Sequence, residues 1–219
     1  IIGALDQQSL RAAATLYSLI SKHEPLKVPD MRTAETVKVV ENSLRDVEIA
    51  YANVIALYCE KMKIDVKTVI NCVNTHPGRK MREPGAGVGG ACIPVNPYFI
   101  VQTSKDSYTN LLIEARKIND YMSQYVAEQV SQWLKQEEVR TEATVLMLGY
   151  SYKANVGDVR FSPAKKIFNE LRKLGFKVVI YDPYVETVVS EAERKLFIED
   201  PYKEAKKVDC IIATVGHDI

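Results

Sequence analysis

A run of glycines followed by a cysteine is the part of the sequence best suited to chemistry. Residues 83–99 read EPGAGVGGACIPVNPYF, and three of the glycines fit the G-x-G-x-x-G spacing of a dinucleotide-binding loop. That loop works when a strand leads in and a helix leads out, so that the helix N-terminus faces the pyrophosphate. Here a proline precedes the glycines, and Pro94 and Pro97 would break a helix that began at Gly90. The context therefore argues against a cofactor loop.

Two interpretations of the glycine stretch remain. It is either a tight structural loop between helices, or a loop whose backbone N–H groups approach a ligand and present the residue that follows, Cys92. Glycines permit close backbone approach, and oriented N–H donors favour ionisation of a thiol. A lone cysteine is core filler by default. Beside three glycines and before a proline-locked turn, Cys92 becomes a candidate nucleophile.

The other cysteines, Cys59, Cys72 and Cys210, are expected to pack in the core. No C-x-x-C spacing occurs, and the chain has only three histidines, so the sequence predicts neither a zinc site nor a disulfide framework. Free thiols favour a reducing, cytoplasmic setting.

Composition excludes several broad classes of function. The 219 residues carry a net charge of +1 with 47% hydrophobic residues, which predicts no nucleic-acid or anionic-membrane partner. No apolar run reaches the ~18 residues that a membrane span requires.

The elements that must position Cys92 fall into two regions. Residues 1–138 have helical periodicity, with Asp6 and Asp65 as expected N-caps and a connector, HEPLKVPD, with room for a short strand. The predicted helices span 6–22, 32–63, 65–75 and 107–135. A helix over 32–63 would be ~45 Å long. A helix of that length needs packing along both sides, so we expect a homodimer through it.

The period changes after a charged linker, QEEVRTE, at residues 136–142. Residues 142–219 alternate apolar strands with helices, which predicts a Rossmann-like parallel sheet that is incomplete. The predicted order is strand 143–149, helix 162–175, strand 177–183, helix 200–208 and strand 209–215. The fold class is therefore an all-α domain followed by an α/β domain.

Three stretches resemble one enzyme family. GVGGACIPVNPYF is similar to the glycine-rich loop and catalytic cysteine of the UDP-glucose/GDP-mannose dehydrogenases, and its CIPV wording is most like the branch that oxidises UDP-N-acetyl-D-mannosamine. AETVKVVENSLRDVEIAYAN (34–53) resembles the family's central helix, and GYSYKANVGDVRFSPA (149–164) resembles the start of its C-terminal, UDP-binding domain. The three occur in the family's order and at about its spacings.

The resemblance implies an activity and a missing part. The family oxidises a sugar C6 alcohol to a carboxylate with two NAD⁺, through a cysteine thiohemiacetal and thioester. Its members begin with an NAD-binding Rossmann domain, which this chain lacks, so we expect this piece alone not to reduce NAD⁺. It also implies dimerisation through the central domain.

The resemblance assigns roles residue by residue. Cys92 is the expected nucleophile, and Lys38 and Asn42 match an active-site lysine and amide that lie one helical turn apart and could donate to an oxyanion at C6. On the residues alone, Lys38 and Asn42 would be surface residues of a helix. Arg160 matches an arginine near the bound NAD. The expected substrate contacts are Gly87, Gly89, Gly90, Tyr98, Phe99 and Lys153.

Two departures from the family pattern affect the prediction. Asn96 stands where the family usually has an aspartate that handles protons, and an amide is a poor general base. Ala91 stands where this branch often has histidine. The alternatives are therefore a non-catalytic nucleotide-sugar-binding and dimerisation module, or a UDP-glucose 6-dehydrogenase.

Overall fold

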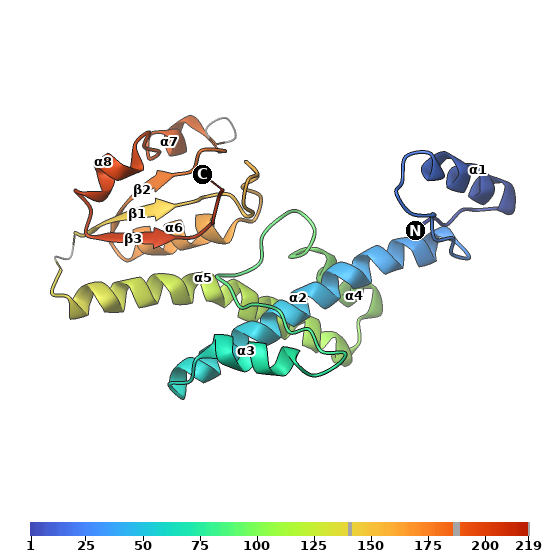
Figure 1. Cartoon of the computed structure of the whole chain (residues 1–219), viewed down its shortest axis with the longest axis horizontal. Helices are drawn as coiled ribbons and strands as arrows, with labels where there is room; N and C mark the ends of the chain where they lie inside the picture. The colour runs from blue at the N-terminus through green and yellow to red at the C-terminus, as the bar shows by residue number, and fades with distance from the viewer. Residues whose placement is uncertain (140–141, 186–188, 219) are drawn as a thin grey trace.

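The computed structural model describes residues 1–139, 142–185 and 189–218, and it shows a helical part followed by a small parallel sheet (Figure 1). The predicted fold class is confirmed. Two residues of the charged linker, 140 and 141, lie outside the described part of the chain.

Residues 1–28 form a small unit beside the start of the longest helix (Figure 1). Helix α1 (Gln7–Ser18) begins at the predicted cap, because the Asp6 carboxylate accepts the Ser9 N–H at 2.7 Å. The helix ends earlier than the predicted residue 22. On either side of it, Ile2 and Lys27 pair as a parallel bridge. The connector after α1 therefore contains an extended segment.

Two long helices cross in the helical part, α2 (Met31–Lys61) and α5 (Asn110–Gln136). The cap of α2 is Asp30, which accepts the Thr33 N–H at 2.7 Å, so the helix starts slightly before the predicted position. Asp65 caps α3 (Val66–Asn74), as predicted, and a 3₁₀ turn, η1 (Ser107–Thr109), precedes α5. Among the described helices, none is both long and apolar enough to cross a bilayer.

One helix was not predicted. α4 (Asn96–Ser104) follows the glycine stretch directly, although prolines there argue against a helix. Pro97 lies in its first turn, where the missing N–H would have no intrahelical partner, so the proline is compatible with helix initiation. The prolines exclude a helix that starts at Gly90, and they permit one that starts at Asn96.

The sheet has three parallel strands in the order β2-β1-β3. They are β1 (Thr144–Leu148), β2 (Lys177–Tyr181) and β3 (Cys210–Ala213), in a register that pairs Leu146 with Val179 and Ile211. Helix α6 (Pro163–Lys173) connects β1 to β2 and begins close to the predicted position, with the Ser162 hydroxyl accepting the Ala164 N–H as its cap. Two short helices, α7 (Glu191–Arg194) and α8 (Pro201–Ala205), precede β3.

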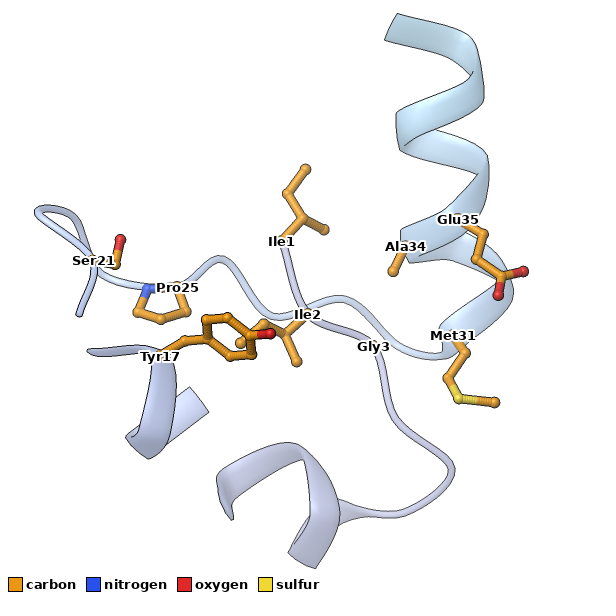
Figure 2. Close-up of a pocket in the computed structure, with 9 residues that line it drawn as sticks. All are labelled: Ile1, Ile2, Gly3, Tyr17, Ser21, Pro25, Met31, Ala34 and Glu35. Atoms are coloured by element: carbon orange, nitrogen blue, oxygen red, sulfur yellow. The ribbon is translucent and has the colours of Figure 1, made fainter. Parts of the chain in front are cut away.

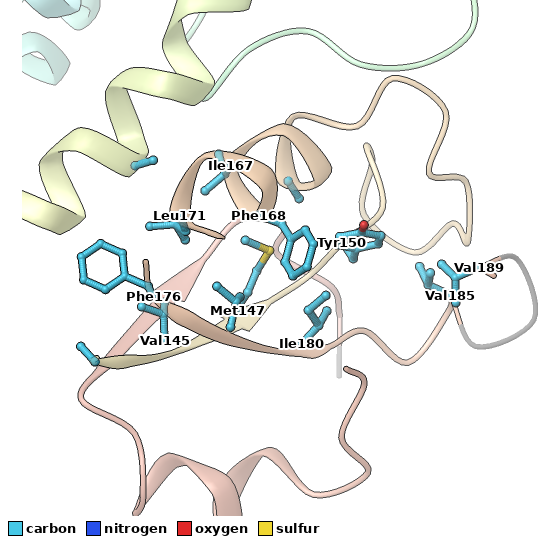
Figure 3. Close-up of a cluster of buried hydrophobic side chains, with 14 of the residues drawn as sticks. Val145, Met147, Tyr150, Ile167, Phe168, Leu171, Phe176, Ile180, Val185 and Val189 are labelled. Carbon is cyan, nitrogen blue, oxygen red and sulfur yellow. The ribbon is translucent and has the colours of Figure 1, made fainter. Parts of the chain in front are cut away.

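The main core lies between the sheet and α6, and Figure 3 shows its side chains. Ile167, Phe168 and Leu171 of α6 face buried residues of β1 and β2. Tyr150 packs edge-on against Phe168, with ring centroids 6.1 Å apart. Ala127 and Leu134 of α5 join the same cluster, so α5 forms a third layer outside α6 and ties the sheet to the helical part.

Asp182 organises the carboxyl edge of the sheet. It is 3% exposed and accepts the N–H groups of Tyr150 at 2.7 Å, Ser151 at 2.9 Å and Tyr184 at 2.9 Å. Burial alone would raise the pKa of Asp182, but the three backbone hydrogen bonds outweigh burial and lower it. The ionised carboxylate therefore stabilises the loops that follow β1 and β2.

We predict that Asp182→Asn lowers the free energy of unfolding by roughly 1–3 kcal/mol at neutral pH, because charge-assisted hydrogen bonds are lost. The folded-state pKa is lowered, so the contribution is fully present above the ordinary aspartate value of about 3.9 and disappears as the pH falls through the folded-state value. Urea unfolding from pH 7 to pH 3 should show the gap between wild type and variant closing at the acid end. A gap that stays constant would contradict this assignment.

Candidate active site

The predicted site residues come from three segments that meet beside the glycine stretch. Lys38 and Asn42 lie on α2, Cys92 and Asn96 lie at the start of α4, and Arg160 lies in the loop that leads into α6. Sequence positions more than a hundred residues apart in the chain are thus brought together by the packing of α2, α4 and the 149–162 loop.

Cys92 and Asn96 are joined by the start of α4. The Cys92 carbonyl accepts the N–H of Val95 at 3.1 Å and the N–H of Asn96 at 2.9 Å. This places the cysteine on the turn before the helix, and Cys92 is exposed. The thiol is therefore not core filler, as a candidate nucleophile requires.

Asn42 reaches the same turn from α2. It is 4% exposed, and its Nδ2 donates to Oδ1 of Asn96. Asn42 is therefore not a surface residue, and the structure brings three of the four predicted catalytic residues together. One N–H of Asn42 and the NH₂ group of Asn96 take no part in this hydrogen bond.

Lys38 is placed differently. It lies one turn before Asn42 on α2, but its side chain is 67% exposed and its ammonium pairs with Glu41 at 2.7 Å. An exposed ion pair of this kind contributes at most about 1 kcal/mol, so little free energy holds the Lys38 ammonium at Glu41.

The backbone of the glycine stretch lies very close to neighbouring segments of the chain. A Cβ on Gly89 would lie 2.6 Å from Cβ of Tyr152 and 2.9 Å from Cδ of Pro163. Gly87 and Gly90 have φ of +129° and +89°, and the Gly90 N–H donates to the Arg160 carbonyl at 2.9 Å. Gly89 and Gly90 thus form a clamp with Tyr152 and the residues around Arg160, whereas nothing lies within 4 Å of a Cβ at Gly85. A substrate contact by these glycines stays a prediction.

Arg160 is tied by its backbone to the residues before Cys92, since its carbonyl accepts the Gly90 N–H at 2.9 Å. Hydrogen bonds with Asp158 are the main cause that raises the pKa of Arg160, with smaller contributions from Tyr152 and from Cys92. The guanidinium is 66% exposed and its Nε lies 3.0 Å from both carboxylate oxygens of Asp158. Lys153, in the same loop, is exposed.

Tyr98 and Phe99 are on the first turns of α4 and are 43% and 52% exposed. Neither ring is buried in the core, and their predicted contact with a substrate stays a prediction. Cys72 is also exposed, contrary to prediction, because α3 turns Ile70 inward and Cys72 outward. Cys59 is buried as expected, and burial raises the pKa of the half-buried Cys210.

A hollow on the sheet was missed by sequence reasoning. It measures about 530 Å³ and lies over the face of β1 and β3 beside α8, reaching the strand ends at Gly149, Pro183 and His217. Nδ1 of His217 accepts the Asn155 N–H at 2.9 Å, so Nε2 donates to Asp182 at 3.2 Å, and the ring stacks against Tyr184 with centroids 4.9 Å apart. The signal was available: polar residues at the carboxyl ends of parallel strands mark ligand sites.

A second hollow, of about 470 Å³, lies in the N-terminal unit (Figure 2). Ile1, Ile2, Tyr17, Pro25 and Met31 form most of its wall. It contains none of the predicted site residues.

Comparison with known proteins finds a matching family domain for the helical part and for the sheet part of the chain. Residues 32–121 match the central domain of the UDP-glucose/GDP-mannose dehydrogenase family, and residues 146–219 match that family's UDP-binding domain. The chain belongs to this family. The central-domain match is narrower than the predicted domain, 1–138, and leaves the N-terminal unit outside it.

Curated relatives and a solved structure agree with this family. A UDP-N-acetyl-D-mannosamine dehydrogenase of Methanocaldococcus jannaschii is 38% identical over 189 residues, which is 86% of this chain and 43% of the relative. An NDP-N-acetyl-D-galactosaminuronic acid dehydrogenase of Ralstonia solanacearum is 34% identical over 220 residues, 99% of this chain and 50% of the relative.

The structure of UDP-D-ManNAc dehydrogenase from Pyrococcus horikoshii superposes with a TM-score of 0.86 at 31% identity, over 99% of this chain and 49% of that one. The chain thus spans about half the length of the relatives it matches. The predicted resemblance is confirmed.

We predict that Gly89→Ala destabilises the protein by roughly 1–3 kcal/mol, because its Cβ meets Tyr152 and Pro163 across the clamp. Gly85→Ala is the matched control, since nothing lies within 4 Å of a Cβ at Gly85. Denaturant unfolding midpoints of the two variants give the comparison. Equal midpoints would show that the clamp is not tight.

Proposed function

We propose that this chain is the sugar-nucleotide half of an NAD-dependent dehydrogenase that oxidises the C6 alcohol of UDP-N-acetyl-D-mannosamine to the carboxylate. The observation that carries the proposal is the exposed Cys92 on the turn before α4, beside the Asn42–Asn96 pair and two residues after Gly90, whose N–H bonds the Arg160 carbonyl. The named relatives of the chain support the substrate. Free thiols and a sugar-nucleotide substrate favour the cytoplasm.

The chain's own residues supply a nucleophile and hydrogen-bond donors. Once the C6 alcohol has lost a hydride and a proton, the Cys92 thiolate attacks the aldehyde carbon and forms a C–S bond, which leaves the negative charge on the C6 oxygen. The free N–H of Asn42 and the ammonium of Lys38 donate to that oxygen. Loss of a second hydride gives the thioester, which water hydrolyses to the carboxylate and the free thiol.

NAD, when bound, accepts the hydrides. In this chain Arg160 is the residue proposed to face its phosphates, because its guanidinium is exposed and near Cys92. Residues 1–28, with one helix and the isolated Ile2–Lys27 bridge, lie outside the matched central domain.

A second candidate function is nucleotide-sugar binding without turnover. It is favoured by Asn96, because an amide cannot take a proton from the water that hydrolyses the thioester. The two functions differ in one measurement, since only the dehydrogenase forms NADH with a nucleotide sugar.

We predict that the full-length protein forms NADH with UDP-N-acetyl-D-mannosamine and that Cys92→Ser lowers the rate by roughly a hundredfold or more, because an alcohol replaces the thiolate. Cys72→Ser, an exposed thiol on α3, is the control and should keep wild-type activity. A panel of UDP- and GDP-sugars followed by NADH absorbance gives the substrate. Full activity of Cys92→Ser would overturn the mechanism, and binding without NADH would select the second function.

We also propose a homodimer through an apolar face of α2. Seven residues recur at alternating spacings of three and four, the pattern that places side chains along one helical seam. They are Val37, Val40, Leu44, Val47, Tyr51, Val54 and Tyr58. Six of them are 36–60% exposed, so the face is not covered within the chain.

We predict that Leu44→Lys combined with Tyr51→Lys converts the dimer to a monomer, because each protomer would then bury two unpaired ammonium groups in the interface. Leu174→Lys, an exposed leucine after α6, is the control and should remain dimeric. Light scattering gives the mass directly. A wild-type mass equal to one chain at high concentration would contradict the dimer.

A further inference from the structure

A buried polar seam runs between the crossing helices α2 and α5. Asp46 and Asn53 on α2 are both fully buried, and Arg116 and Asn119 on α5 are 3% and 1% exposed. Arg116 donates to Oδ1 of Asp46 at 2.7 Å, and Nδ2 of Asn119 donates to the same oxygen at 2.9 Å. Polar side chains in such a place need a reason, because burial without full pairing is costly.

The hydrogen bonds of the seam have a single direction. The Asp46 carboxylate only accepts, so the Asn119 amide must turn its NH₂ group toward it and its oxygen away. That oxygen accepts Nδ2 of Asn53 at 3.0 Å, which turns the Asn53 oxygen outward. The outward oxygen accepts the Gly85 N–H at 2.8 Å. Asp46 thus acts through Asn119 and Asn53: it fixes the direction of the Asn53 side-chain oxygen, which accepts the Gly85 N–H at the start of the glycine stretch.

A second bond holds the next residue of the same loop. Oγ of Ser123 on α5 donates to the Ala86 carbonyl at 2.8 Å, and Ser123 is 2% exposed. Asn53 of α2 and Ser123 of α5 therefore bind adjacent backbone groups of the loop, the Gly85 N–H and the Ala86 carbonyl. The loop has no regular structure of its own between these contacts and the Gly90–Arg160 hydrogen bond.

We propose that Asn53, oriented by Asn119 and Asp46, and Ser123 are positioning residues for Cys92. They act through the backbone of residues 85 and 86 and touch neither the thiol nor a substrate. The proposal rests on the function proposed for Cys92, since a loop that carries a nucleophile must be held within a fraction of an ångström.

Ser123→Ala and Asn53→Ala test the proposal, with Ser43→Ala as the matched control. Ser43 is 3% exposed and its Oγ bonds the Val39 carbonyl within α2, so its loss removes a buried hydroxyl without touching the loop. We expect backbone amides of residues 85–92 to exchange with deuterium roughly three- to tenfold faster in Ser123→Ala and Asn53→Ala than in Ser43→Ala. Unfolding midpoints identify any general loss of stability.

A second readout uses the chemistry of the thiol. Site-resolved mass spectrometry gives the rate at which iodoacetamide alkylates Cys92. In the full-length enzyme, Ser123→Ala and Asn53→Ala should lower kcat and leave KM for the sugar nucleotide nearly unchanged. Loop exchange and alkylation equal to those of Ser43→Ala would overturn the positioning role. An inactive wild type with faster loop exchange in Ser123→Ala would instead overturn the proposed function and leave the positioning of the loop intact.

Discussion

The buried ion pair between Arg116 and Asp46 is the interaction on which the rest of the structure depends. Removing one partner of such a pair costs about 3–5 kcal/mol, because the other charge is left buried alone. Two long helices that meet through a polar seam therefore have one register. That register fixes Asn42 of α2 opposite the start of α4, and so it sets the geometry around Cys92.

The same arginine links the helical part to the sheet. Asp120 accepts Nη2 of Arg116 at 2.7 Å and also pairs with Lys166 of α6. The apolar residues of α5 that join the core of the sheet act alongside this polar bridge. Because α5 contacts α2 on one side and α6 on the other, the 149–162 loop lies close to the glycine stretch. At Gly89, a Cβ would meet Tyr152 across this contact. The candidate site is a consequence of that junction.

Sequence patterns predicted the elements whose signals are local. Ser162 followed by proline gave the start of α6, and short apolar runs gave the three strands. Helix α4 was missed because prolines were taken only as helix breakers. Asn53 and Asn119 carry no local signal, since an asparagine on a long helix has the same sequence pattern whether it faces solvent or a buried partner. Their roles depend on residues about 70 positions away, which periodicity cannot pair.

Compared with an aspartate, the amide of Asn96 changes the chemistry available to the candidate site more than it changes the site's hydrogen bonding. The side-chain oxygen of Asn96 accepts from Asn42, so the NH₂ group of Asn96 points away from that helix. A carboxylate at this position would accept the same hydrogen bond and keep a second oxygen as a base. With asparagine, the surroundings of Cys92 contain amide donors and the Arg160 cation, which stabilise an oxyanion. For the proposed dehydrogenase, the amide at position 96 therefore bears on the last step, in which water hydrolyses the thioester and a base is required, and not on attack of the thiolate on the aldehyde.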